Sequence, residues 1–416
     1  MGLKEKIISL SEKYLNEIIA VRRHLHANPE LSFQEYNTSK FIAGKLNEWG
    51  IPYKDGIVKT GIVATITGAQ LPSLGGKDRA GYCLALRADM DALPITETNE
   101  VEYKSQNTGV MHACGHDVHT SSLLGAAKIL HELKNEFSGT VKLIFQPGEE
   151  KAPGGASLMI KEGVLEDPKP SSIIAQHVFP SLEAGKVGFR SGKYMASTDE
   201  IYLTVKGKGG HAAMKGTYVN PLLIAAEILI SLEKEFGASP LSSGEGQRVR
   251  RGGAIPTVLA FGRMHANGTT NIIPNEVKID GTFRTMDETW RKEAQNIIKE
   301  VAVSKAKSMG GDCDVNIMTG YPALVNDEQT TAKAKKYAED LLGKENVIEL
   351  ELRMTGEDFS FYAQKIPACF YRLGTGNISK GITSGVHTST FNIDESALQT
   401  GMGLMAWIAL NELKCI

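Results

Sequence analysis

The chain has 416 residues, and 46 Lys and Arg almost balance 48 Asp and Glu, giving a formal net charge of −2. This length predicts two or three domains, with cores that need no disulfide support. A near-neutral chain has no basic surplus for a polyphosphate partner, which argues against nucleic-acid binding. The apolar stretches are shorter than the ~18 residues of a membrane-spanning helix, which argues against a membrane protein.

The cysteines indicate a reducing compartment. They are odd in number, form no Cys-x-x-Cys pair and stand at positions 83, 114, 313, 369 and 415. Such a set argues against a disulfide framework. The charged, amphipathic first residues show no secretory signal. We therefore expect a cytoplasmic protein.

The first part of the chain alternates helices with buried strands. Helical periodicity covers residues 5–49 and 118–135. Apolar runs typical of buried strands cover 61–66, 82–87, 140–145 and 172–176. This alternation predicts an α/β domain with a largely parallel sheet between two layers of helices.

The order of elements changes after about residue 190 and returns near the end. Strand patterns occur at 200–206, 257–264, 275–284 and 313–318, and helical patterns at 220–236 and 288–308. Their β-α-β-β-α-β order predicts a small ferredoxin-like α+β domain. The Gly- and Ser-rich segment 239–255 predicts an exposed loop. A helix, a strand and a closing helix are then predicted at 328–342, 368–373 and 394–413.

We therefore predict one α/β domain made of residues 1–192 and 323–416, interrupted by an inserted domain over residues 193–322.

Four potential metal ligands stand close together at His112, Cys114, His116 and His119. Thiolate and imidazole are preferred ligands of zinc and similar ions. A glycine between Cys114 and His116 allows a tight bend that points both the same way. The alternative is a His-rich helix N-terminus with a small buried cysteine.

Further candidates follow other predicted strands. Glu149 and Glu150 follow the strand at 140–145, and His177 follows that at 172–176. Ligands of open α/β sheets bind at the carboxyl ends of the strands. One more histidine, His387, stands in the loop before the last predicted helix. The predicted ligands are therefore Cys114, His116, Glu150, His177 and His387. They exceed the four ligands of a tetrahedral zinc and suit two ions.

The remaining carboxylates have two interpretations each. Glu149 can stay uncoordinated as a proton carrier, or the pair with Glu150 can be an ordinary surface turn. Asp89 and Asp91 can orient a ligand histidine, or cap the next turn.

These residues belong to motifs that run nearly end to end: RRHLHANPELSFQE (22–35), LRADMDALP (86–94), MHACGHDVHT (111–120), FQPGEE (145–150), QHV (176–178), GKGGHAA (207–213), TNIIPNEV (270–277), GTFRT (281–285), TGEDFSFY (355–362) and VHTSTFNID (386–394). With them the chain resembles the metal-dependent amidohydrolases of the aminoacylase/carboxypeptidase family. It is most similar to the branch of hippurate hydrolase, N-acyl-L-amino acid amidohydrolases and hydrolases of indole-acetyl–amino acid conjugates.

The resemblance implies a three-layer α/β/α catalytic domain of the di-metal exopeptidase type, with an inserted lid domain that also forms a homodimer or higher homo-oligomer. It implies two divalent ions (Zn, Mn, Co or Ni) on the ligands named above, with Glu149 as general base and acid. His211 would reach the partner subunit's active site. Asn271 and Arg284 would contact substrate carboxylate and oxyanion, and Gly356 would contribute backbone.

This chain departs from many relatives at Asp89-x-Asp91, where they have His-x-Asp and an aspartate that bridges the metals. Here Cys114 would take part instead. A thiolate is softer than a carboxylate, so metal preference does not carry over.

The expected function is hydrolysis of the amide bond of N-acyl-L-amino acids to a carboxylic acid and a free amino acid. Three alternatives stay open at this point: a di- or exopeptidase on the same two metals, a thiol hydrolase with Cys114 as nucleophile, and a non-catalytic metal- or amino-acid-binding relative.

Overall fold

The computed structural model describes residues 1–69, 82–237 and 255–413. Cys415 and the predicted loop at 239–255, up to residue 254, lie outside them. The chain divides into two compact units. The first unit consists of Met1–Gly192, Val325–Glu351 and Asp358–Ile416, and the second of Lys193–Leu324 and Leu352–Glu357.

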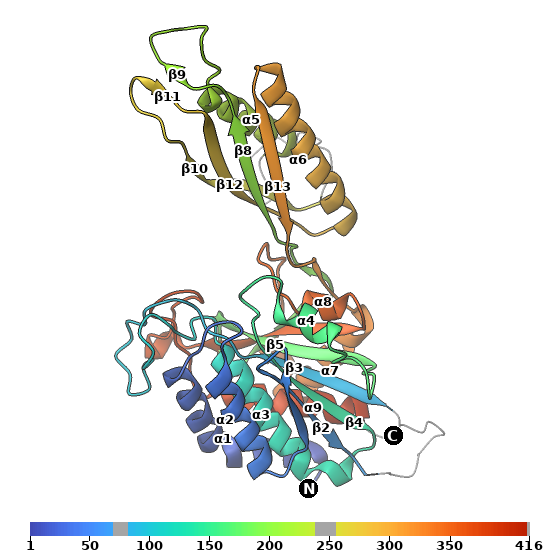
Figure 1. Cartoon of the computed structure of the whole chain (residues 1–416). Coiled ribbons are helices and arrows are strands. Elements are labelled where there is room, and N and C mark those ends of the chain that lie inside the picture. Colours follow the sequence, from blue (N-terminus) through green and yellow to red (C-terminus); the bar gives the residue numbers. More distant parts are fainter. Residues whose placement is uncertain (70–81, 238–254, 414–416) are drawn as a thin grey trace. The chain divides into compact units, whose positions relative to one another are not determined.

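The first unit is built on an eight-stranded sheet with the order β1-β2-β4-β3-β5-β16-β6-β15 (Figure 1). Its strands are β1 (Tyr53–Ile57), β2 (Gly61–Thr67), β3 (Cys83–Asp89), β4 (Thr140–Gln146), β5 (Ser172–Glu183), β6 (Val187–Phe189), β15 (Val347–Glu349) and β16 (Ala368–Gly376). The neighbours β4, β3, β5 and β16 are parallel to one another. However, β1 with β2, β2 with β4, and β16 with β6 are antiparallel. The sheet is therefore mixed rather than largely parallel, and the short β1–β2 turn is one cause, since it reverses the chain.

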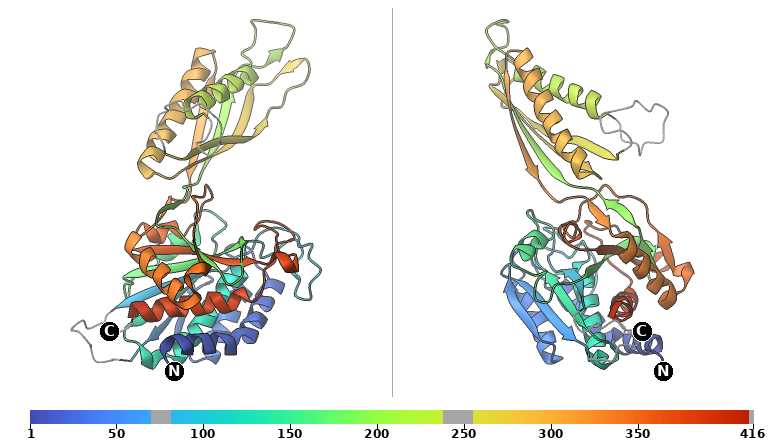
Figure 2. Two further views of the ribbon diagram at one scale, coloured as in Figure 1. Left: turned by 180° about the vertical axis from the view of Figure 1, so that it is seen from behind. Right: turned by 90° about the vertical axis from the view of Figure 1, so that its right-hand side faces the viewer.

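Helices cover both faces of this sheet. Against one face pack α3 (His116–Glu132) and α9 (Ala397–Leu413), with α1 (Leu3–Ala27) against both. Their common side of the sheet can be followed in Figure 2. The alternation of β4 explains the two faces. Val141, Leu143 and Phe145 join the core of this helical layer, while Gln146 points to the opposite face and hydrogen-bonds Asp358.

Four shorter helices complete the layers. The helix α2 (Tyr36–Glu48) contacts β1 and β2, and the helix α7 (Glu328–Leu342) contacts α9. On the opposite face, α4 (Gly155–Lys161) contacts β4 and α8 (Ser360–Ala363) contacts β16. The α/β layering confirms the predicted fold class.

The second unit contains a four-stranded antiparallel sheet with the order β10-β12-β8-β13. Its elements follow the chain as β8 (Asp199–Lys206), α5 (Pro221–Phe236), β10 (Thr257–His265), β12 (Glu276–Thr285), α6 (Glu288–Ser308) and β13 (Asp312–Thr319). This is the ferredoxin-like order. Asp287 caps α6, because its Oδ1 accepts from the amides of Thr289 and Trp290 at 3.0 Å.

Short strands complete the second unit and its borders. In the second unit β9 (Gly210–His211) pairs with β11 (Ile272–Ile273). Where the chain passes between the units lie β7 (Gly192–Met195) and β14 (Leu324–Asn326). Among the described residues, no helix is both long and apolar enough to cross a membrane.

Candidate metal centre

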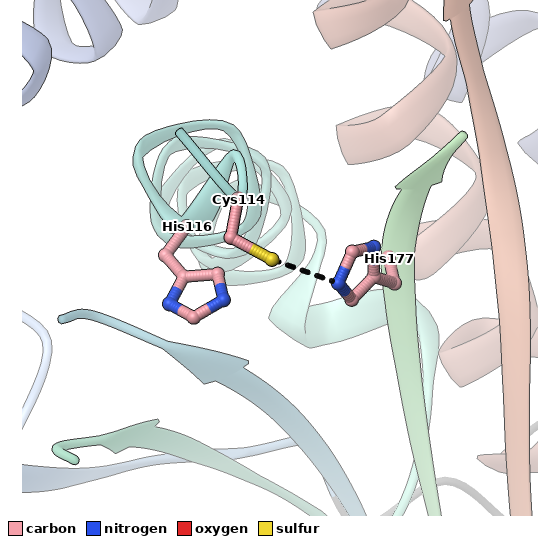
Figure 3. A group of neighbouring side chains, drawn as sticks. All are labelled: Cys114, His116 and His177. Carbon is pink, nitrogen blue, oxygen red and sulfur yellow. Dashed lines mark hydrogen bonds between the residues drawn. The ribbon is translucent and has the colours of Figure 1, made fainter. Parts of the chain in front are cut away.

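Residues from several loops and strand ends of the first unit converge on Cys114. Its Sγ lies 3.5 Å from Nε2 of His177 and 3.3 Å from Nε2 of His387. Figure 3 shows Cys114 and His116 side by side at the start of α3, with the thiol directed at His177. Glu150 Oε1 lies 3.2 Å from His387 Nε2 and 3.9 Å from His116 Nε2. The structure thus brings all five predicted ligands together.

Two unusual backbone conformations shape this cluster. Gly115, with φ of +82°, precedes α3, and a Cβ there would lie 2.6 Å from Val178 Cγ2. His387, although not glycine, has φ of +63°, and its amide donates to Ala113 O at 2.7 Å. That bond ties the loop of His387 to the loop of Cys114.

The sheet fixes His177. This residue lies within β5 rather than after it, because the pairing with β16 continues to Phe179. Its Nδ1 donates to Val178 O at 2.8 Å, so Nε2 faces the thiol.

Asp91 fixes His116. Its Oδ1 lies 3.1 Å from His116 Nδ1, so the ring turns Nε2 toward Glu149 and Glu150. Asp91 Oδ2 also accepts from Ser32 Oγ at 2.6 Å and from the amide of Glu150 at 3.0 Å. Such outer contacts set ring orientation and tautomer at metal sites.

His119 and His112 differ from the predicted ligands. His119 uses both ring nitrogens, one with Asp89 Oδ1 at 2.5 Å and one accepting from the amide of Val178 at 2.9 Å. Asp89 thus orients His119, while Asp91 orients His116. His112 is buried, and neither of its ring nitrogens has a hydrogen-bond partner among the described residues.

The charges of the cluster oppose one another. Burial, followed by the nearby Glu150 and Glu149, raises the pKa of the Cys114 thiol well above its ordinary value. Burial opposes charge on His116, but Asp89 and Asp91 outweigh it and raise the pKa to about 10. Without a cation, the thiol is therefore held protonated. A bound divalent cation would reverse this preference, because it favours thiolate and neutral imidazole.

The cluster fits divalent metal ions. Among the described residues, the buried Nε2 of His116 has no hydrogen-bond partner. An unsatisfied buried polar atom costs about 1–3 kcal/mol, so this nitrogen needs a partner. The donor atoms of Cys114, His116 and His177 lie within 4.8 Å of one another, as do those of Cys114, Glu150 and His387. Thiolate, imidazole and carboxylate at such spacing suit zinc and similar metals.

Glu149 lies beside this cluster, with its Oε2 4.0 Å from His116 Nε2 and only 7% of the residue exposed. The amide of Asp358 lies 3.5 Å from its Oε1. Asp358 in turn accepts from Arg87 Nη2 at 2.8 Å, from Gln146 Nε2 and from the amide of Ala156.

The sequence did not point to this supporting network. One signal was available: Arg87 stands inside an apolar strand, and a buried guanidinium requires carboxylate partners. Those partners are Asp89 and Asp358.

The second unit holds the remaining candidates in two places. His211 pairs with Ile272, and the amide of Ala212 donates to Asn271 O at 3.0 Å, so His211 and Asn271 are neighbours. Both are exposed. Arg284 lies near the other end of β12, roughly 26 Å along the strand from its first residue at ~3.3 Å per residue.

The surroundings of Arg284 include the segment that carries Gly356. Arg284 Nη1 donates to Met354 O at 3.2 Å, and burial lowers the pKa of the guanidinium. A Cβ on Gly356 would lie 2.3 Å from Thr198 Cγ2, so only glycine fits there. The two places cannot contact the same small molecule within one copy of this unit.

Comparisons with known proteins agree with this arrangement. The model of the peptidase family M20/M25/M40 matches residues 85–411. Thermostable carboxypeptidase 2 of Saccharolobus solfataricus is 35% identical over 99% of both chains. N-acetyl-L-cysteine deacetylase of Bacillus subtilis is 35% identical, over 92% of this chain and 85% of the relative.

A solved structure is similar as well. The Bacillus subtilis YXEP protein, described as a dinuclear metal binding peptidase from the M20 family, has a TM-score of 0.80 and 32% identity, covering 97% of this chain and 100% of its own. The fold, the cluster around Cys114 and these likenesses lead to one conclusion: the chain belongs to peptidase family M20/M25/M40.

Proposed function

We propose that this protein is a metal-dependent amidohydrolase that cleaves N-acyl-L-amino acids to a carboxylic acid and a free amino acid. The observation that carries the proposal is the cluster of buried Cys114, His116 and His177 with half-buried Glu150 and exposed His387, and with Glu149 beside it. The likeness to an N-acetyl-L-cysteine deacetylase supports an N-acyl amino acid as substrate.

Two divalent ions are the cofactors in this proposal, and the likeness to a dinuclear metal binding peptidase supports the number. Their ligands would be Cys114, His116, Glu150, His177 and His387. Zn, Mn, Co and Ni are all compatible with this donor set. When bound at these residues, the ions would supply Lewis-acid chemistry, which polarises a carbonyl and lowers the pKa of water.

Glu149 performs the proton transfers in this mechanism. It accepts the proton of the attacking water and passes it to the leaving nitrogen of the amino acid. Asp91 holds His116 in one tautomer, and Asp89 does the same for His119.

Residues of the second unit recognise the substrate. Arg284 offers a planar fork of donors for the free carboxylate, with backbone at Gly356 nearby. His211 and Asn271 stabilise the oxyanion. Because these two places are far apart in one copy, we assign His211 and Asn271 to the site of a second copy, in a homodimer formed through the second unit. A cytoplasmic location accords with the four described cysteines, which are free.

A carboxypeptidase-type exopeptidase is the second candidate, since Thermostable carboxypeptidase 2 is equally similar. It would use the same ions and Glu149, but would accept a free amino group on the acyl side.

Replacement of the proton carrier tests the mechanism. Glu149→Gln removes the base without changing its size, so kcat should fall by ~10²–10⁴-fold while bound metal, measured by elemental analysis, stays at the wild-type level. Glu166→Gln, an exposed carboxylate beyond α4, serves as the control and should retain full activity. A Glu149→Gln enzyme of near-normal kcat would remove Glu149 from the reaction.

A substrate panel distinguishes the two candidates. N-acetyl-, N-benzoyl- and aminoacyl-amino acids are compared on the metal-replete protein. Faster cleavage of the aminoacyl compounds would favour the exopeptidase. Activity that survives complete chelation would instead assign the chemistry to the Cys114 thiol.

A further inference from the structure

The residues on either side of Glu149 each donate their backbone amide to a carboxylate that takes no proton in the proposed reaction. The amide of Gly148 donates to Glu35 Oε1 at 2.9 Å, and the amide of Glu150 donates to Asp91 Oδ2 at 3.0 Å. Glu149 therefore stands between two fixed amides. Both carboxylates connect to the residues from Ser32 to Glu35, which we call the 32–35 segment.

Glu35 is fully buried, and its carboxyl oxygens accept hydrogen bonds from Phe33, Thr60 and Gly148. Its Oε1 accepts from the amide of Phe33 at 2.8 Å as well as from that of Gly148. Its Oε2 accepts from Thr60 Oγ1 at 2.8 Å. Both oxygens of the Glu35 carboxyl group are thus hydrogen-bonded. Through Oε1, Glu35 holds the loop of Gly148 and Glu149, which is distant in sequence.

The Gly148 peptide is constrained on three sides. Gly148 has φ of +62°, and a Cβ there would lie 2.4 Å from Cε1 and Cζ of the Phe33 ring. Its carbonyl accepts from the amide of Gly155 at the start of α4 at 3.0 Å. Phe33 itself has φ of +64°, which a bulky residue adopts only when its surroundings require it. The hydrogen bond from the Phe33 amide to Glu35 Oε1 holds the backbone in this conformation.

A second connection runs from the same segment to Glu150. Ser32 Oγ donates to Asp91 Oδ2 at 2.6 Å, and the same oxygen accepts the amide of Glu150. The 32–35 segment therefore fixes the residue before Glu149 directly and the residue after it through Asp91.

We propose that Glu35 is a positioning residue for the reaction: by accepting the amide of Gly148 it sets the direction in which Glu149 points at the attacking water. This inference rests on the proposed function, in which Glu149 is the general base. A shift of about 1 Å in a reacting group can cost ~10²-fold in rate, so a loop held this closely is part of the catalytic geometry.

The acceptor atom, rather than the negative charge, carries this role. A glutamine at position 35 can accept both amides through Oε1 and donate through Nε2 to the Thr60 hydroxyl, which can accept as well as donate. Glu35→Gln therefore preserves the contacts. Glu35→Asp keeps the charge but withdraws the acceptor by one methylene, and Glu35→Ala removes it.

Three substitutions of Glu35 test the proposal in the metal-replete full-length protein. For Glu35→Ala and Glu35→Asp we expect kcat per metal-loaded enzyme to fall by roughly 10–10²-fold, with KM nearly unchanged. For Glu35→Gln we expect near-wild-type kcat. Backbone hydrogen exchange at Gly148 supplies a second readout: protection should be lost in Glu35→Ala and retained in Glu35→Gln.

Glu30 provides the matched control. Its carboxylate accepts from the amides and side chains of Asn37 and Thr38 at the start of α2, and none of these partners belongs to the Glu149 loop. Glu30→Asp should lower stability without changing kcat.

The possible results separate the proposal from simpler roles. A kcat that is unchanged in folded, metal-loaded Glu35→Asp would overturn it and leave Glu35 with a structural role only. Equal losses in Glu35→Gln and Glu35→Ala would also overturn it, because charge would then be decisive. If the wild type cleaved no N-acyl amino acid, the proposed function would fail. The exchange of the Gly148 amide would still decide whether Glu35 orders the loop.

Discussion

Glu35 combines a fixed geometry with a shifted ionisation. Burial, followed by repulsion from Asp91, raises the pKa of its carboxyl group to about 7, from an ordinary value of 4.5. A carboxyl group whose pKa is raised on folding contributes stability as the neutral acid. That contribution is complete below pH ~4.5 and is lost as the pH rises through about 7.

The stability of wild type and Glu35→Gln should therefore diverge with pH, since the amide does not ionise. Between pH ~4.5 and ~7.5 we expect the Tm of the variant to rise relative to wild type, by an amount equivalent to about 1–3 kcal/mol. Thermal unfolding of both proteins at matched metal concentration measures the difference. A gap that is constant over this range would contradict the raised pKa.

At the residue scale, the sequence was sufficient to select the candidate metal ligands, but not the residues whose hydrogen bonds hold the site in place. Cys114, His116, Glu150, His177 and His387 stand out because few side chains bind metals and because strand ends meet at one edge of the sheet. Glu35 and Asp358 did not stand out. Their role depends on hydrogen bonds to loops far away in the chain, such as that from Glu35 to Gly148, and these appear only once the tertiary structure is formed.

At the scale of elements, periodicity predicted the helices and strands well, since long amphipathic or apolar runs allow few alternatives. The strand directions at the sheet edges were not predictable, because hydrophobic runs do not record whether a neighbour runs parallel. The strand that carries His177 is longer than the predicted 172–176. Its extension, β5, depends on pairing with β16, which hydrophobic runs do not record either.

The start of α3 depends on Gly115. Alanine there would have to keep φ of +82° and place its Cβ 2.6 Å from Val178 Cγ2. We expect Gly115→Ala to destabilise the protein by about 1–3 kcal/mol and to weaken metal binding, since Cys114 and His116 flank this residue.

A second glycine-to-alanine variant is the control for this prediction. Gly44 lies in α2, and nothing lies within 4 Å of a Cβ placed there. Gly44→Ala should stabilise the protein slightly, by about 0.5–1 kcal/mol. Calorimetry and metal titration of both variants decide the matter, and an equal Tm for the two would refute the steric argument.

At the scale of the whole molecule, metal should couple to stability. Ions that bind the folded cluster but not the unfolded chain raise the Tm by mass action. Chelation should therefore lower the Tm by several degrees, and re-addition of Zn, Mn, Co or Ni should restore it in the order of their affinities for the site. Scanning calorimetry with stepwise re-addition measures this, and a Tm indifferent to chelation would argue against a metal site in the first unit.

The chain enters the second unit twice, once for Lys193–Leu324 and again for Leu352–Glu357, and it returns at Asp358, whose amide faces Glu149. This threading sets a rule for protein engineering. An exchange of the second unit between relatives that cuts only at the borders of the long segment would leave the short one beside foreign neighbours, where Gly356 meets Thr198. Chimeras that transplant both segments as a matched set keep that contact, and they also keep the spacing that delivers Asp358 to its place.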